Sequence, residues 1–202
     1  MLGTSALAEV AGPLKDFAEK LGGPQGAFWL AEFKRFLRKE GLWRPVVWKT
    51  IKLGTGLKTA NDFRKALKDN ECRVLYEAGG ILKRPAFEAA AKEFEIDLAI
   101  VSAVDLGFKK MPTLREIYAR AFGLGLELCT TEVGPQLRLQ YEDQPRGEWL
   151  PIAMEPFLLA FGKREIFVVC HDHAGLWLGS TSGNADGRWH LDRQLVFVLP
   201  RK

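Results

Sequence analysis

The chain has 202 residues, of which 47% are hydrophobic, 11% aromatic and 27% charged, and its formal net charge is +4. This composition excludes an intrinsically disordered chain and predicts a packed core that needs neither disulfides nor metal. No apolar run is long enough to cross a bilayer and no leader pattern opens the sequence, so we expect no membrane association.

Positive charge is concentrated in the first part of the chain. Residues 1–84 carry 16 Lys and Arg against 9 Asp and Glu, whereas residues 85–202 carry 13 against 16. We therefore predict a basic, mainly helical part over 1–84 and a β-rich part over 85–202, two parts that can also form one continuous domain.

Apolar residues at helical spacing, bounded by Pro or a capping residue and by Gly or Asn, predict several helices. The expected helices are 13–21, 25–40, 60–70, 86–94 and 114–122. Two of them begin with a capping box, formed by Thr59 with Asp62 and by Thr113 with Glu116.

Short apolar or alternating runs between turn-rich pieces predict strands. The expected strands are 46–53, 96–104, 136–141, 149–154, 165–170, 175–179 and 194–199. The run 96–104 is almost wholly apolar, as in a central strand, and Pro151 places its strand at a sheet edge or a bulge. The predicted fold class is α+β: N-terminal helices with a short sheet, then a C-terminal antiparallel β-sheet in the form of a meander or small barrel.

Several strings are distinctive, among them WKTIKLGTGLKTANDFRKALKDN, LELCTTEVGPQLRLQYEDQP, GEWLPIAMEPF and the closing GLWLG and VFVLP. They resemble an uncharacterised family of small bacterial proteins found mostly in genomes assembled from environmental samples, and the likeness covers most of the chain. The resemblance implies a bacterial, cytoplasmic protein and carries over no activity and no functional residue. CRVLYEAGGIL departs from the family's usual string in that region.

The strongest functional signal is the basic segment 34–68, in which cations alternate with aromatic residues. Cationic side chains neutralise phosphates and aromatic rings stack on bases, so this pattern indicates a nucleic-acid surface. Its candidate residues are Lys34, Arg35, Arg38, Lys39, Trp43, Arg44, Lys49, Lys52, Lys58, Arg64, Lys65 and Lys68. The alternative is that Phe36 and Phe63 lie on the core-facing sides of their helices and that the cations lie on the solvent-exposed sides.

All three histidines of the chain lie near its end. His171 and His173 at i, i+2 on a strand would point the same way, and His190 on a neighbouring strand could complete a site for a transition metal such as zinc. A metal with an open coordination position would then make the chain a metal-dependent enzyme. The alternative is a hairpin turn at His-Asp-His-Ala-Gly, because the spacing matches no standard zinc signature.

No complete catalytic string is present. The Gly54-Thr55-Gly56 turn before a helix can bind phosphate, but it lacks the spacing of a nucleotide-binding loop, and the acids of the second part cannot be paired from sequence. Three widely spaced cysteines fit reduced, buried thiols of a cytoplasmic protein. We therefore expect a non-enzymatic binding or interaction protein with an unknown protein partner and no cofactor, followed by the nucleic-acid and metal-enzyme alternatives.

Overall fold

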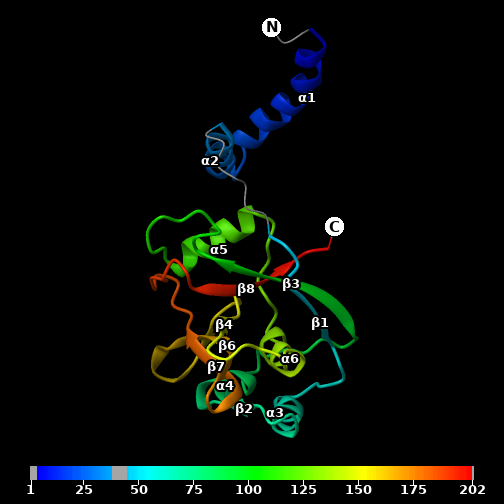
Figure 1. Cartoon of the computed structure of the whole chain (residues 1–202), viewed down its shortest axis with the longest axis vertical. Helices are drawn as coiled ribbons and strands as arrows, with labels where there is room; N and C mark the ends of the chain where they lie inside the picture. Colours follow the sequence, from blue (N-terminus) through cyan, green and yellow to red (C-terminus); the bar gives the residue numbers. More distant parts are fainter. Residues whose placement is uncertain (1–3, 38–44, 202) are drawn as a thin grey trace. The chain divides into compact units, whose positions relative to one another are not determined.

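The computed structural model describes residues 4–37 and 45–201 and confirms the α+β class (Figure 1). The chain divides into two compact units, Met1–Arg44 and Pro45–Lys202. The predicted division at 84/85 is not the one observed, because strands on either side of residue 84 pair with each other: β1 with β3, and β2 with β7.

The first unit is a helical hairpin of α1 (Thr4–Leu21) and α2 (Gly26–Leu37). Phe17 and Phe33 hold the two helices together, with ring centroids 4.9 Å apart. Pro13 lies inside α1 rather than at its start, because the Ala-containing segment before it is also helical. Among the hairpin side chains that the structure describes, 10–34 and 36–37, none is buried.

The second unit contains two sheets. Sheet A is antiparallel, with the order β1 (Lys49–Leu53), β3 (Phe94–Ser102) and β8 (Gln194–Leu199). The central position of β3 confirms the prediction for the apolar run. Strand β8, expected to follow the other C-terminal strands into one meander, instead pairs with β3.

Sheet B is built on the hairpin of β6 (Arg164–Asp172) and β7 (Gly175–Ser182). Its full order is β2 (Arg73–Val74), β7, β6 and β4 (Trp149–Pro151), with β5 (Phe157–Leu158) also on β6. The edge position of β4 confirms the prediction made from Pro151. The β2–β7 pair is parallel, whereas β6 pairs antiparallel with β4, β5 and β7.

Both predicted capping boxes are present. Thr59 and Asp62 open α3 (Ala60–Asp69), and Thr113 and Glu116 open α5 (Leu114–Gly123). The helix expected over 86–94 is absent from the described structure there, whereas an unexpected short helix, α4 (Tyr76–Leu82), lies before it.

The segment predicted as strand 136–141 is part of a helix, α6 (Val133–Gln140). Its polar residues recur at helical spacing and are held by the neighbouring β1 and its turn. Glu132, 1% exposed, accepts hydrogen bonds from the backbone N–H of Gly54 and Ala90, both 2.8 Å, and Gln140 both accepts from and donates to the backbone of Lys52. These tertiary contacts override the two-residue alternation of QLRLQY.

On the side of α6 toward sheet B, Arg138 is fully buried. Its guanidinium donates to the backbone oxygens of Tyr141 and Cys170 and to the side-chain oxygen of Gln144. A Cβ at Gly134 would lie 2.7 Å from the ring of Phe167, so glycine lets the helix approach β6 closely. Contacts on both sides thus fix α6 between the sheets.

Helix α3, strand β2 and helix α4 lie at the end of the second unit drawn at the bottom of Figure 1. The 3-10 turn η1 (Ala160–Gly162), between β5 and β6, approaches them from sheet B. No helix within residues 4–37 and 45–201 is long and apolar enough to span a membrane.

Candidate ligand-binding groove

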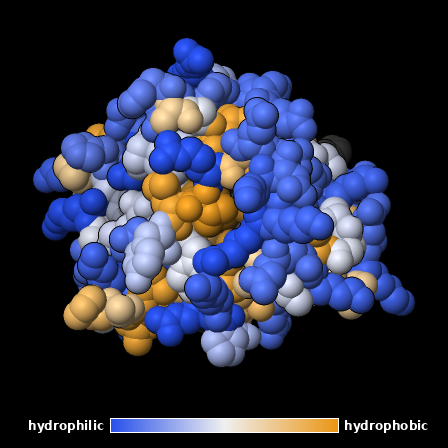
Figure 2. All heavy atoms as spheres, turned by 90° about the horizontal axis from the view of Figure 1, so that it is seen from below, coloured by the Kyte–Doolittle hydropathy of each residue, from blue (hydrophilic) through white to orange (hydrophobic). Residues whose placement is uncertain are grey.

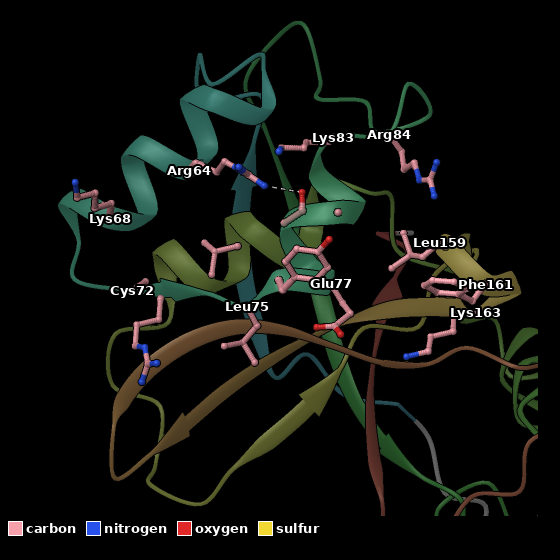
Figure 3. A pocket seen from close by; sticks show the side chains of 16 residues that line it. Arg64, Lys68, Cys72, Leu75, Glu77, Lys83, Arg84, Leu159, Phe161 and Lys163 are labelled. Atoms are coloured by element: carbon pink, nitrogen blue, oxygen red, sulfur yellow. Dashed lines mark hydrogen bonds between the residues drawn. The ribbon is translucent and has the colours of Figure 1, made fainter.

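A groove of about 960 Å³ lies between α3, the β2–α4 segment and the η1 turn (Figure 3). We call it the basic groove; its lining includes Arg64 and Lys68 of α3, most residues of the segment 72–84, and Leu159, Ala160, Phe161 and Lys163. Figure 3 shows α3 side chains on one side and Leu159, Phe161 and Lys163 on the other. A cavity of this size accommodates an extended organic ligand.

The groove is strongly positive. Among the residues that the structure describes, six cations line it against a single carboxylate, Glu77, and these cations are Arg64, Lys68, Arg73, Lys83, Arg84 and Lys163. Within the described part of the chain, no salt bridge joins any of the six to a carboxylate. Their charge is therefore available to an external anion.

Apolar side chains stand among these cations. Leu75 is 36% exposed, Tyr76 91% and Phe161 99%. Figure 2, which views the molecule from the end that carries α3, β2 and α4, shows apolar surface in the middle of a hydrophilic face. Phe161 also has a left-handed backbone, with φ 57° and ψ 25°, which is strained for an aromatic residue. The groove thus combines cationic and apolar contacts.

Arg64 is held in the groove wall by α4. Its Nη2 donates to the backbone oxygen of Gly79 over 2.7 Å, while its buried Nε has no hydrogen-bond partner among the described residues. A Cβ at Gly79 would lie 2.6 Å from Nη2, so the glycine is what allows this approach. At Gly80 the nearest atom to such a Cβ is Leu159 Cδ2 at 3.8 Å, an ordinary contact.

This difference makes the two glycines a matched pair. We expect Gly80→Ala to stabilise the protein by about 0.5–1 kcal/mol, the usual gain of alanine in a helix. In Gly79→Ala the new Cβ displaces the Arg64 guanidinium, which loses its hydrogen bond to the Gly79 oxygen. That loss offsets about 1 kcal/mol of the gain in stability. Urea denaturation of both variants measures the difference, and equal stabilities would contradict the role assigned to Gly79.

Cys72 lies at the wall of the groove and is only 7% exposed. Burial raises the pKa of its thiol, an effect only partly offset by the Arg138 guanidinium. A protonated thiol is a poor nucleophile at neutral pH, so this environment does not activate Cys72 for nucleophilic attack.

The structure distributes the predicted nucleic-acid residues over several surfaces. Arg64 and Lys68 line the basic groove, while Lys65 is exposed on another flank of α3 and Lys58 precedes that helix. Lys34 belongs to the first unit. Of Arg35 only the helical backbone is described, and Arg38, Lys39, Trp43 and Arg44 lie outside the described residues.

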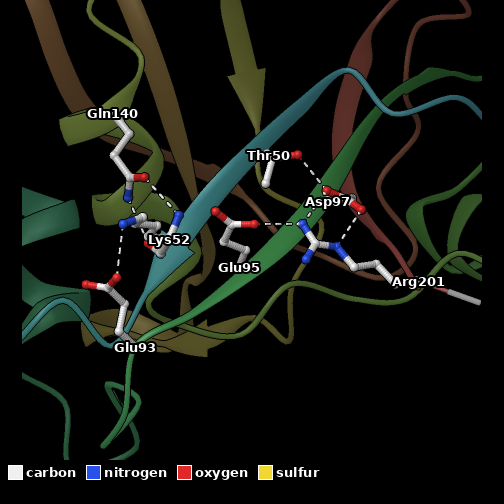
Figure 4. A network of polar contacts seen from close by, with 7 residues as sticks. All are labelled: Thr50, Lys52, Glu93, Glu95, Asp97, Gln140 and Arg201. Atoms are coloured by element: carbon white, nitrogen blue, oxygen red, sulfur yellow. Dashed lines mark hydrogen bonds and ion pairs between the residues drawn. The ribbon is translucent and has the colours of Figure 1, made fainter.

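The remaining two predicted cations occupy opposite faces of β1. Lys49 lies over the ring of Tyr141, 4.6 Å from its centroid, and 3.7 Å from Asp143. Lys52 pairs with Glu93 over 3.0 Å (Figure 4). Of the aromatic residues in the segment, Phe63 is fully buried and is unavailable for base stacking.

The exposed face of sheet A carries a polar network in which cations are matched by acids (Figure 4). Arg201 donates to Asp97 over 2.8 Å and to Glu95 over 3.2 Å, and Thr50 donates to Asp97 over 2.6 Å. The hydrogen bonds from Arg201 and Thr50 lower the pKa of Asp97 to about 2. Unlike the groove, this face needs no external anion.

We predict that Arg201→Ala raises the pKa of Asp97 toward its ordinary value, measured by following its carboxyl resonance during an NMR titration. Because the folded pKa lies below the unfolded one, the ionised carboxylate contributes stability above about pH 4 that is lost as the pH falls toward about 2. The exposed pair of Arg115 and Asp186 gives the control, since Arg115→Ala leaves Asp97 unchanged. An unaltered titration of Asp97 in Arg201→Ala would contradict the assignment.

The histidines do not assemble as the metal hypothesis requires. His171 is the next-to-last residue of β6 and its Nδ1 donates to the backbone oxygen of Gln144, His173 is exposed in the following turn, and His190 is exposed near β8. In the ranges 4–37 and 45–201, no three or more His, Cys, Asp or Glu side chains are grouped so as to hold a metal ion. The turn interrupts the two-residue alternation of the strand, by which the side chains of His171 and His173 would have pointed to the same face.

Sequence reasoning missed most of the groove. Arg73, Tyr76, Lys83, Arg84 and Phe161 all lie outside the segment 34–68. A detectable signal was the aromatic Phe161 in a turn before Gly162 and Lys163, where packing against a core is not expected.

No family model matches the chain, and no curated protein or solved structure matches it.

Proposed function

We propose that the chain is a non-enzymatic binding protein whose ligand site is the basic groove, and that the ligand is an anion carrying apolar or aromatic groups. The observation that carries the proposal is the coexistence of six cations, none in a salt bridge within residues 4–37 and 45–201, with the exposed side chains of Leu75, Tyr76 and Phe161. Exposed cations supply attraction and specificity for an anion, and burial of the apolar side chains supplies affinity.

The expected partner is thus an anion that carries apolar groups rather than an unspecified protein. We keep the resemblance's expectation of a bacterial, cytoplasmic protein, which the three buried, unpaired cysteines support.

The probe that tests it is 1-anilinonaphthalene-8-sulfonate, which joins one anionic group to apolar rings. We expect this dye to bind the folded full chain with a rise in fluorescence, and the double variant Lys83→Glu/Arg84→Glu to bind about tenfold more weakly. The reason is that attractions of up to about 1 kcal/mol each become repulsions.

The matched control is Lys109→Glu/Lys110→Glu, which makes the same charge change at exposed residues outside the groove. Circular dichroism confirms that each variant is folded. Equal dye binding by both double variants, or none by the wild type, would reject the proposed site.

A further inference from the structure

The cations of the basic groove are spread over separate segments rather than gathered at one point. Arg64 and Lys68 come from α3, Arg73 from β2, Lys83 and Arg84 from the residues directly after α4, and Lys163 from the segment after η1. A single phosphate or carboxylate needs convergent donors, whereas a chain of anions needs charge along its path. This distribution favours a polyanion.

The two most exposed aromatic side chains at the groove indicate which polyanion. Tyr76 is 91% exposed and Phe161 99% exposed, so both rings are open to a ligand from outside. Flat ligand groups that alternate with anionic groups are the defining feature of a nucleic-acid strand, and aromatic side chains stack on unpaired bases. Three of the six cations are arginines, whose planar guanidinium also stacks and pairs with phosphate.

An acidic peptide is the competing polyanion, and the backbone of the groove suits it less well. A peptide commonly binds by adding a strand to a sheet edge, but the edge strand here, β2, has only two residues. The next residue, Leu75, already donates its backbone N–H to the oxygen of Leu178, and α4 begins directly after it. Little main chain remains as a template for a peptide.

We infer that the basic groove binds single-stranded nucleic acid, with Tyr76 and Phe161 stacking on bases and the groove cations neutralising phosphates. This inference rests on the proposed function and narrows its ligand to one class.

The test uses the full chain and two fluorescein-labelled ten-nucleotide probes, oligothymidylate and oligouridylate, with fluorescence anisotropy as the readout. We expect binding by at least one probe, and the two probes distinguish DNA from RNA. Tyr76→Ala and Phe161→Ala should each weaken binding by about fivefold to about a hundredfold. Tyr76→Phe keeps the ring and should bind like the wild type, which separates stacking from a loss of fold.

Salt dependence gives a second readout. Log affinity should fall with log salt at a slope no steeper than about −4 for six phosphate contacts, and Lys83→Glu/Arg84→Glu should make the slope shallower by about 1.4. The two alanine variants should leave the slope unchanged, because they remove no charge.

The nucleic-acid inference and the proposed function can fail separately. If the naphthalenesulfonate dye binds in the groove but neither oligonucleotide binds at about 50 mM salt, the nucleic-acid inference is overturned and the proposed function stands. Equal binding of polyglutamate or of a duplex, with no effect of Tyr76→Ala or Phe161→Ala, also overturns it. If the dye does not bind either, the proposed function fails as well.

Discussion

The second unit depends on two buried polar groups at α6, the carboxyl of Glu132 and the guanidinium of Arg138. Such groups are costly to bury unless hydrogen bonds compensate them, so their partners are fixed in place. Glu132 holds the N–H of Gly54 in the turn after β1, and Arg138 holds the oxygen of Cys170 in β6. The α6 helix is thereby tied to both sheets. Helix α3 follows the turn at Gly54, and the η1 residues that line the groove precede β6. The hydrogen bonds of Glu132 and Arg138 therefore also bring the two sides of the basic groove together.

The groove itself is locally unfavourable for the free protein. Six like charges share one hollow without carboxylate partners in the described structure, Phe161 exposes an apolar ring, and its backbone is strained. The network around Asp97 on sheet A shows that the same chain matches cations with acids elsewhere. Such destabilising features, concentrated in one groove, are typical of a binding site, because the ligand supplies the missing interactions.

The sequence predicted those parts of the fold whose signals are local. Both capping boxes are satisfied by residues three positions apart, and the apolar run of β3 reflects its central position. The strand prediction over 136–141 was wrong because the alternation in QLRLQY resembles a strand, while the contacts that select a helix come from Gly54, Lys52 and Phe167, far away in the chain. The prediction of the site was incomplete for a related reason. A count of cations along 34–68 identified Arg64 and Lys68, but the fold adds Arg84 and Lys163 from other segments.

Binding of an anionic, apolar ligand in the basic groove can be mapped residue by residue. The most direct measurement is an amide proton–nitrogen NMR map of the full chain, recorded during titration with 1-anilinonaphthalene-8-sulfonate. We expect the amides that shift to lie in the β2–α4 segment, residues 73–84, and around η1, residues 159–163. Shifts confined to the α1–α2 hairpin or to the exposed face of sheet A would contradict it.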